Sequence, residues 1–291
     1  MILVTGGTGS FGHAFVARHY GGDRIRVLSR DEEKQRAMAL RFPGVEYVIG
    51  DVRDRETVRR AMAGVYRVFH AAALKQVPPL ERQPLEAVRT NTIGTDNVCA
   101  EAWEQGARVV TISTDKAVEP VGVMGASKML AEAVTTSWGY NCVRYGNVIG
   151  SRGSIVPVWR AAVKRGDPVT ITDPEMTRFL ITLDEALDLI DTAMEAPADG
   201  SVYIQRSPAG TVAQLARVIA PGHPTVVTGP RPGEKRHEHL VVPDEHVITA
   251  GEHYIVKRGL PGSGIRYSSD VAPKLTDEAL SALIDMAPDD L

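Results

Sequence analysis

The sequence of 291 residues has little cysteine and no long apolar run. Its two cysteines, Cys99 and Cys142, could pair, but both lie in apolar segments of a chain without a signal peptide, so two reduced thiols are expected. The first apolar run, MILVTGG, breaks at glycine after five residues and is too short for a signal or membrane segment. These features predict a cytoplasmic protein without a membrane partner.

Charge of one sign and metal-ligand spacing are also missing. The chain has 33 Lys and Arg against 36 Asp and Glu, with no block of like charge, which argues against a nucleic-acid partner and favours a small molecule. The HEH at 237–239 could hold a metal, but it lacks a third ligand nearby, so we interpret it as polar surface and predict no metal. No Ser/His/Asp order or zinc-ligand spacing indicates a hydrolase.

Short β-branched runs alternate with helical patterns up to about residue 145. Strands are predicted at ILVT, RIRVLS, VEYVIG, YRVFH, ARVVTIS and NCVRYG, and helices at 11–20, 31–42, 54–64 and 84–105, the last with Pro84 in its first turn. This alternation predicts an α/β fold of the Rossmann type, a doubly wound parallel sheet with helices on both faces.

Beyond residue 150 the elements become shorter and glycine and proline more frequent. Thr182 and Glu185 predict a capping box before the apolar stripe of TLDEALDLIDTAM, and Thr211 with Gln214 predicts a second one. We predict a dinucleotide-binding domain at 1–150, with a return segment at about 177–205, and a smaller C-terminal substrate-binding lobe over most of 151–291.

A glycine-rich loop, TGGTGSFG, follows the first strand and opens the first helix. Gly6, Gly9 and Gly12 would let the backbone approach a pyrophosphate at the positive end of that helix. A tight turn between strand and helix is the alternative interpretation of the glycines alone. The strand, the helix and the position in the chain favour a dinucleotide.

The end of the second strand bears on which dinucleotide is bound. Ser29 and Arg30 offer a hydroxyl and a cation, which favour the 2′-phosphate of NADP, whereas Asp31 could cap the next helix or touch the ribose of NAD. We therefore expect NADP and keep NAD open. Asp51 could accept from the adenine amino group, or it could cap the helix at Arg55.

Four further stretches carry chemistry: HAAALKQVP (70–78), STDKAVEPVGVMGASK (113–128), RYGNVIGSRGSIVP (144–157) and ITDPEMTRF (171–179). With the glycine loop, and with QRSPAGTV and GPRPGEK further on, they resemble the extended short-chain dehydrogenases that act on nucleotide sugars. The sequence is similar to the UDP-N-acetylglucosamine 4,6-dehydratases of polysaccharide biosynthesis, above all to the soluble members that also invert carbon 5.

This resemblance implies a reaction and an acid-base pair. A 4,6-dehydratase oxidises the 4-hydroxyl of the sugar, which acidifies the proton on carbon 5, and water is then eliminated across carbons 5 and 6. The cofactor is regenerated in each turnover. Asp115 and Lys116 lie at the end of the fifth predicted strand, where open sheets place ligands. By resemblance, Lys116 removes the carbon 5 proton and Asp115 protonates the leaving hydroxyl, whereas an Asp-Lys pair without this context would be a solvated ion pair.

Met124 stands where the superfamily has a catalytic tyrosine, four residues before Lys128. A thioether cannot accept a proton, so the proton of the 4-hydroxyl must pass to Asp115, Thr114, Lys116 or water. Partial burial or a cation such as Lys128 would favour the neutral form of Lys116. The resemblance implies that Lys128 binds the nicotinamide ribose and that part of the family shares this methionine.

Other residues receive roles through the same resemblance. The cofactor is expected to contact Gly6, Thr8, Gly9, Ser10, Phe11, Gly12, Ser29, Arg30, Asp51, Val52, Ala71, Ala72, Ala73, Lys75 and Lys128. The UDP-N-acetylglucosamine substrate is expected to contact Lys75, Asn147, Arg152, Arg178, Arg231 and Glu234, with the arginines as candidates for the diphosphate. Asn91 is expected to support the helix that carries Lys128.

Two other functions fit parts of the same pattern. A UDP-hexose 4-epimerase uses the same fold and a transient ketone, but it needs no acid-base pair at carbons 5 and 6. An inactive NADP-binding sensor would explain Met124 but leaves Asp115 and Lys116 without a purpose. The helices at 85–105 and 124–137 could pair with their copies, which predicts a homo-oligomer of at least two subunits.

Overall fold

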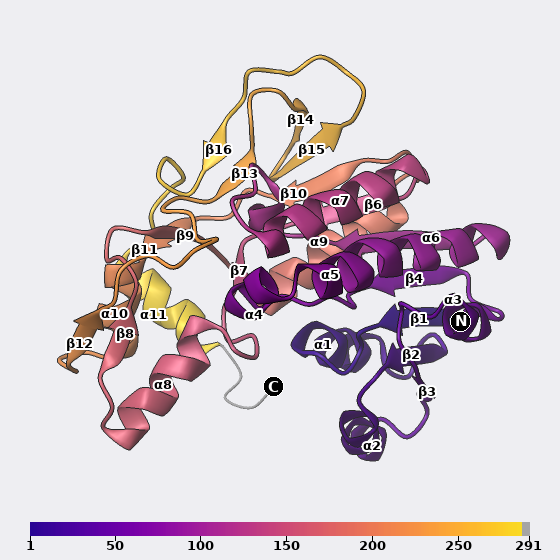
Figure 1. The fold of residues 1–291 in the computed structure, drawn as a ribbon, viewed down its shortest axis with the longest axis horizontal. Helices are drawn as coiled ribbons and strands as arrows, with labels where there is room; N and C mark the ends of the chain where they lie inside the picture. The colour runs from indigo at the N-terminus through magenta and orange to yellow at the C-terminus, as the bar shows by residue number, and fades with distance from the viewer. Residues whose placement is uncertain (287–291) are drawn as a thin grey trace.

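The computed structural model describes residues 1–286, and its centre is a nine-stranded sheet (Figure 1). The strand order is β14-β15-β10-β6-β5-β4-β1-β2-β3. The bounds are β1 Ile2–Thr5, β2 Ile25–Ser29, β3 Glu46–Ile49, β4 Arg67–His70, β5 Arg108–Ile112, β6 Asn141–Arg144, β10 Val202–Gln205, β14 His246–Ala250 and β15 His253–Lys257. The seven strands β10, β6, β5, β4, β1, β2 and β3 pair in parallel, whereas β15 is antiparallel to β10 and β14 is antiparallel to β15. The predicted doubly wound α/β fold is confirmed.

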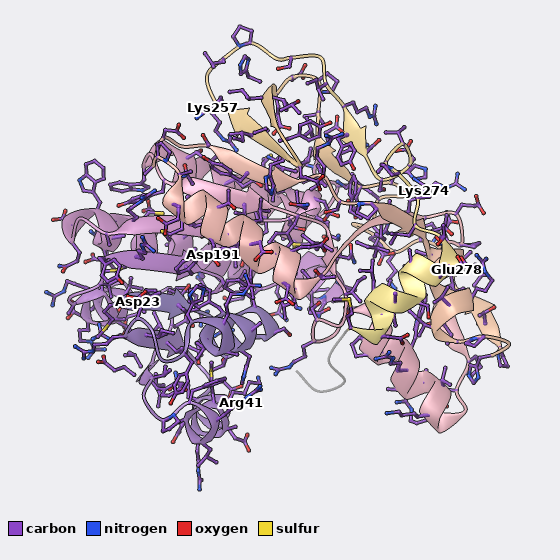
Figure 2. The ribbon with its side chains drawn as sticks, turned by 180° about the vertical axis from the view of Figure 1, so that it is seen from behind. Asp23, Arg41, Asp191, Lys257, Lys274 and Glu278 are labelled. Atoms are coloured by element: carbon purple, nitrogen blue, oxygen red, sulfur yellow. The ribbon has the colours of Figure 1, made fainter. Side chains whose placement is uncertain are left out.

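Helices cover both faces of this sheet because each presents one apolar stripe. One face is covered by α1 (Ser10–His19), α2 (Glu32–Arg41) and α9 (Leu183–Glu195), and the other by α3 (Arg55–Met62), α6 (Gly94–Glu104) and α7 (Val123–Ser137). Viewed from behind, α9 crosses the sheet with Asp191 on its outer side (Figure 2). Phe15 of α1 and Leu187 and Ile190 of α9 are buried in one core cluster, and Val58 and Val98 lie in the other.

The predicted helix at 84–105 contains an irregularity that its sequence did not indicate. It runs as α5 (Pro84–Ala87), a π-helical segment η1 (Val88–Ile93) and then α6. Pro84 begins it, as predicted. Single π turns inside helices are frequent at functional sites, and η1 packs against α7, the helix that carries Met124 and Lys128.

A second lobe lies to one side of the sheet in Figure 1. Its elements are α8 (Ile155–Arg165), α10 (Val212–Ile219), α11 (Asp277–Asp285) and three small sheets, formed by β7 (Asn147–Val148) with β9 (Thr177–Ile181) and β11 (Ala209–Thr211), by β8 (Val169–Ile171) with β12 (Thr225–Val227), and by β13 (His239–Val241) with β16 (Tyr267–Ser268). Trp159, Leu215 and Leu280 belong to its separate apolar cluster. Strands β14 and β15 leave this part of the chain and extend the main sheet.

The two predicted capping boxes differ. Thr182 and Glu185 form the complete box at the start of α9, as predicted. Thr211 accepts from the backbone N–H of Gln214, but the Gln214 amide donates instead to Leu275 O and Asp277, so the second box is only half formed. Gln214 therefore fastens α10 to the start of α11.

Two further features bear on the sequence-based expectations. Cys99 and Cys142 are both buried and free. Within residues 1–286, no helix has the length and apolar content needed to cross a membrane.

Candidate functional site

A cleft of about 550 Å³ follows the carboxyl ends of strands β1 to β6. Ligands of open parallel sheets bind at this edge. Of the residues predicted to contact the cofactor, Gly12 alone does not line the cleft; those that do are Gly6, Thr8, Gly9, Ser10, Phe11, Ser29, Arg30, Asp51, Val52, Ala71, Ala72, Ala73, Lys75 and Lys128.

The glycine loop between β1 and α1 fits the pyrophosphate of a dinucleotide. Gly6 has a φ of +67°, and a Cβ on it would lie 2.7 Å from Ala72 Cα. A Cβ on Gly12 would lie 2.1 Å from the Gly7 carbonyl oxygen, so only glycine lets α1 pack against the loop. Gly9 precedes α1 without a side-chain cap, which leaves backbone N–H groups for phosphate oxygens.

The adenosine end of the cleft is lined by residues 29–31 and by Asp51. Arg30 donates to Asp51 at 3.5 Å, and its side chain is half exposed. Asp31 caps α2, as one of the two interpretations predicted. Asp54 rather than Asp51 caps α3, so the proposed capping role of Asp51 is wrong.

The predicted acid-base pair lies directly after β5. Thr114 caps a short 3₁₀ turn, η2 (Asp115–Ala117), and its hydroxyl donates to Asp115 Oδ1 at 2.9 Å. Lys116 Nζ donates to the same oxygen at 2.9 Å. Thr114 and Lys116 line the cleft, whereas Asp115 is completely buried behind them. Asp115 therefore reaches the cleft through these two neighbours.

Burial and charge act on this pair in different ways. Burial raises the pKa of Asp115 although Lys116 opposes the shift, and Oδ2 has no hydrogen-bond partner among residues 1–286. Burial would lower the pKa of Lys116, but the carboxylates of Asp115 and Glu238 outweigh it and raise that pKa. The resting lysine is therefore an ammonium, and the opposing cation is Arg178 rather than the expected Lys128.

Met124 and Lys128 lie one turn apart on α7. Met124 is buried in a small apolar cluster with Leu80 and Ala87, yet it also contributes to the wall of the cleft. The Lys128 ammonium donates to the carbonyl of Ile112 at 2.5 Å, and burial lowers its pKa. The helix thus places a thioether on the cleft wall one turn before an anchored cation.

Asn91 and Glu81 hold the start of α7 in place. Asn91 of η1 is buried and donates to Ser127 Oγ at 2.9 Å and to Leu74 O at 2.9 Å, which agrees with the supporting role expected for it. Glu81 of α4 (Val77–Arg82) accepts from the backbone N–H of Val123 at 2.7 Å. A carboxylate at this helix end also complements the helix dipole.

The residues predicted to contact the substrate are spread more widely. Asn147 lines the cleft with its Oδ1 3.5 Å from Lys116 Nζ, and Lys75 lines it while donating to Arg152 O at 2.9 Å. Arg178 is buried, and its guanidinium donates to Thr177 O at 2.7 Å.

Arg231 and Glu234 do not line the cleft. Two hydrogen bonds close a turn between them. The backbone N–H of Arg231 donates to the Glu234 carboxylate at 3.3 Å, and the backbone N–H of Glu234 donates to Arg231 O at 3.1 Å. The Arg231 side chain is exposed and takes part in neither of these two bonds.

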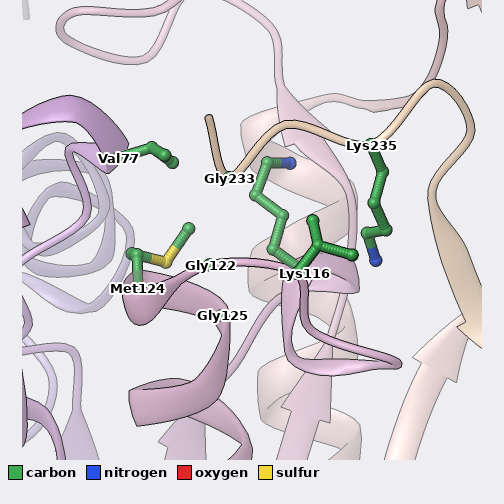
Figure 3. Close-up of a pocket in the computed structure, with 8 residues that line it drawn as sticks. Val77, Lys116, Gly122, Met124, Gly125, Gly233 and Lys235 are labelled. Carbon is green, nitrogen blue, oxygen red and sulfur yellow. The ribbon is translucent and has the colours of Figure 1, made fainter. Parts of the chain in front are cut away.

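A second, small hollow of about 10 Å³ adjoins the cleft beside Lys116 (Figure 3). Met124 borders it on one side, and the loop with Gly233 and Lys235 borders it on the other. A hollow of this volume holds about one water molecule. Lys116 and Met124 line both the cleft and the small hollow, so the hollow lies directly beside the candidate catalytic groups.

Glu238 is the site residue that the sequence did not reveal. We interpreted the HEH at 237–239 as polar surface, but Glu238 is only 1% exposed. Its Oε1 lies 3.4 Å from Lys116 Nζ, and its Oε2 lies 3.0 Å from Lys235 Nζ. The surface interpretation is therefore wrong for Glu238, which is buried and makes a long-range contact with Lys116 in the turn after β5.

Comparisons with known proteins agree with this geometry. A family model described as polysaccharide biosynthesis protein matches residues 2–258. A curated relative from Rickettsia canadensis (strain McKiel), named UDP-glucose 4-epimerase, is 44% identical over 82% of this chain and 77% of its own length. Further Rickettsia proteins with this name are 41 to 43% identical.

Two solved structures have the same fold. The X-ray structure of Pen from Bacillus thuringiensis is 32% identical, covers 97% of this chain and 96% of its own, and has a TM-score of 0.93. DesIV, a dTDP-glucose 4,6-dehydratase from Streptomyces venezuelae with NAD and TYD bound, is 20% identical with a TM-score of 0.75 and covers 98% of this chain and 95% of its own.

Proposed function

The chain belongs to the polysaccharide biosynthesis protein family, which contains NAD-dependent nucleotide-sugar dehydratases and epimerases, and from this premise we propose that it is a UDP-N-acetylglucosamine 4,6-dehydratase. The observation that carries the proposal is the pair Asp115 and Lys116 at the end of β5, joined at 2.9 Å. Oxidation at carbon 4 alone requires no second acid-base pair, whereas elimination across carbons 5 and 6 requires a base and an acid.

A nicotinamide dinucleotide, when bound, supplies the hydride chemistry at carbons 4 and 6. The residues that would hold it are the glycine loop, Lys128 and the groups at the ends of β2 to β4. We propose NADP as the preferred form, since Arg30 lines the adenosine end of the cleft with a half-exposed side chain.

Proton transfers fall to the chain's own residues. We propose that the proton of the 4-hydroxyl passes to Thr114, whose own proton moves to Asp115 over the 2.9 Å hydrogen bond. The same route in reverse protonates the leaving 6-hydroxyl, so that one carboxyl carries one proton from carbon 4 to the departing water. This role needs no tyrosine at position 124.

Lys116 would take the proton from carbon 5 in its neutral form. Asp115 and Glu238 raise the pKa of Lys116, so the neutral amine is scarce at neutral pH. Its population increases as the pH rises, and the rate of proton removal should increase with it. Asn147 Oδ1, 3.5 Å away, would help to aim the amine. The final proton on carbon 5 would come from Lys116, which regenerates the neutral amine, or, in an inverting enzyme, from water on the other face of the sugar, with Lys116 then releasing its proton to solvent.

A UDP-hexose 4-epimerase is the second candidate, because the Rickettsia relatives at 41 to 44% identity carry the name UDP-glucose 4-epimerase. An epimerase returns the hydride to carbon 4 and leaves carbons 5 and 6 unchanged. The acid-base pair after β5 would then have no role in the reaction, which is why we place this function second.

The oligomeric state is also a proposal. Leu85, Ile93 and Trp103 of the α5-η1-α6 run and Leu130 of α7 are exposed, and α5, η1 and α6 all pack against α7. We propose that these helices pair with their copies in a homodimer or larger homo-oligomer.

Replacing Lys116 by methionine tests the function. The dehydratase predicts that Lys116→Met lowers formation of the 6-deoxy-4-keto sugar by roughly 10²- to 10⁴-fold, because the carbon 5 base is lost. Lys164→Met, at an exposed position of α8, is the matched control and should act like the wild type. If Lys116→Met still interconverts the carbon 4 epimers at the wild-type rate, the epimerase is the correct function.

A further inference from the structure

Glu238 is a buried carboxylate from the second lobe that ends at the catalytic lysine of the first. It immediately precedes β13, and its backbone is fixed by two hydrogen bonds with Ser269, each 2.8 Å long. Its side chain reaches across to Lys116 Nζ at 3.4 Å. A buried carboxylate is costly unless it is paired, and here both of its partners are lysines.

The second partner, Lys235, ties this carboxylate to the β5 loop. Its ammonium lies 3.0 Å from Glu238 Oε2 and donates to Val118 O at 2.8 Å and to Asp115 O at 3.4 Å. Asp115, Lys116, Glu238 and Lys235 therefore form a series of alternating charges that links the two lobes, with both carboxylates buried. Arg178 of β9 also acts on both Lys116 and Glu238.

We propose that Glu238 is a positioning residue that holds the Lys116 amine between two carboxylates and so sets both its direction and its protonation. The inference rests on the proposed function, in which Lys116 is the carbon 5 base. It assigns to the second lobe a direct part in the proton chemistry, in addition to binding the substrate.

The geometry around Lys116 Nζ supports this role. An ammonium has three N–H donors, and three acceptors surround it: Asp115 Oδ1 at 2.9 Å, Glu238 Oε1 at 3.4 Å and Asn147 Oδ1 at 3.5 Å. The acceptors come from three separate parts of the chain, so they restrict the side chain in three directions. Without Glu238 the amine keeps the acceptors Asp115 and Asn147 and loses the carboxylate that precedes β13.

Charge supports the same role. Burial would raise the pKa of Glu238, but Lys116, Lys235 and Arg178 outweigh it and hold that pKa at about 2, so the group stays a carboxylate at neutral pH. A fixed negative charge beside Lys116 stabilises its ammonium. It therefore favours the product of proton abstraction and delays the loss of the resting proton as the pH rises.

The test measures how Lys116 titrates in the whole protein. The wild type, Glu238→Gln, Glu238→Asp and the control Glu252→Gln, at an exposed position in the β14-β15 turn, are pulse-labelled with acetic anhydride across a pH series. Acetylation of Lys116 is then quantified by peptide mass spectrometry. Only the neutral amine reacts, so the labelling rate reports the population of the neutral form.

We expect Glu238→Gln to move the rise in Lys116 labelling to lower pH and to raise the rate at a fixed pH below the midpoint by roughly tenfold, since a nearby opposite charge is removed. Glu238→Asp, which keeps the charge, should fall between Glu238→Gln and the wild type, and Glu252→Gln should match the wild type. If Glu238→Gln does not fold, labelling rises at all lysines and not at Lys116 alone. In that case the Glu238→Asp variant decides the outcome.

An unchanged Lys116 profile in folded Glu238→Gln or Glu238→Asp would overturn the inference. The labelling needs no turnover, so it is separate from a test of the function itself. That second test follows deuterium exchange at carbon 5 in the wild type with the 4-keto product. Absence of this exchange would rule out the proposed dehydratase function. Exchange together with an unshifted Lys116 labelling profile would rule out only the positioning role of Glu238.

Discussion

The buried ion pair between Glu132 and Arg144 anchors α7 to β6, and breaking it should destabilise the fold strongly. Arg144 donates to Glu132 at 2.7 and 3.0 Å and also to Leu240 O at 2.8 Å, and both charged side chains are almost fully buried. Glu132 lies one turn beyond Lys128 on the same helix. The pair therefore also keeps the Lys128 ammonium in place beside the cleft.

The perturbation is Arg144→Met, which leaves the buried Glu132 carboxylate with Arg258, at 3.5 Å, as its remaining ion-pair partner within residues 1–286. Removal of one partner of a buried pair costs about 3 to 5 kcal/mol, which lowers the melting temperature of a chain of this size by roughly 5 to 8 °C. Arg258→Met is the matched control: it removes a partly exposed cation from the same carboxylate and should cost no more than about 1 kcal/mol.

Thermal unfolding followed by circular dichroism measures both variants. The double variant Glu132→Leu with Arg144→Met should recover part of the loss, because replacing a buried pair by apolar groups is often neutral or stabilising. If Arg144→Met melted within about 2 °C of the wild type, the burial and pairing described for α7 and β6 would be incorrect.

Three further predictions concern pH, the glycine loop and the cofactor. His70 is buried between Thr5 and Thr95, and burial lowers its pKa to about 3. Because the unfolded state binds the proton first as the pH falls, the free energy of unfolding should drop by about 3 kcal/mol between pH 7 and pH 4. His70→Gln should flatten this pH dependence when unfolding is measured by urea titration. Gly12→Ala places a Cβ 2.1 Å from Gly7 O and should abolish dinucleotide binding by calorimetry, with Gly21→Ala, which meets no atom within 4 Å but has a positive φ, showing only a stability loss. Arg30→Ala should weaken NADP by about tenfold or more and leave NAD nearly unchanged, and equal losses for both would contradict a 2′-phosphate contact.

Much of the fold was predictable because its signals are local. Each of the first six strands is a short β-branched run, and the glycine loop, the capping box at Thr182 and the first residue of α5 follow from residues within one turn of each other. The π-helical segment η1 was not predictable, because VRTNTI carries no local signal for it, and its packing against α7 brings together segments distant in sequence.

The site was predictable in part for the same reason. Thr114, Lys116, Met124 and Lys128 come together because they flank one strand end and one helix. The position of Asp115 behind the cleft and the contact of Glu238 with Lys116 depend on how two distant segments meet, and no local pattern indicates that meeting. The second hydrogen bond of the capping box predicted at Thr211 does not form for the same reason, since the Gln214 amide donates to Asp277 at the start of α11 instead.

The most direct test of the proposed function is proton NMR of UDP-N-acetylglucosamine incubated with the purified wild-type protein in deuterated water. The dehydratase predicts a 6-deoxy-4-keto sugar with deuterium at carbon 5, and the couplings of that product would also give its configuration there. Formation of UDP-N-acetylgalactosamine without deuterium at carbon 5, or no reaction even with NADP or NAD supplied, would contradict it.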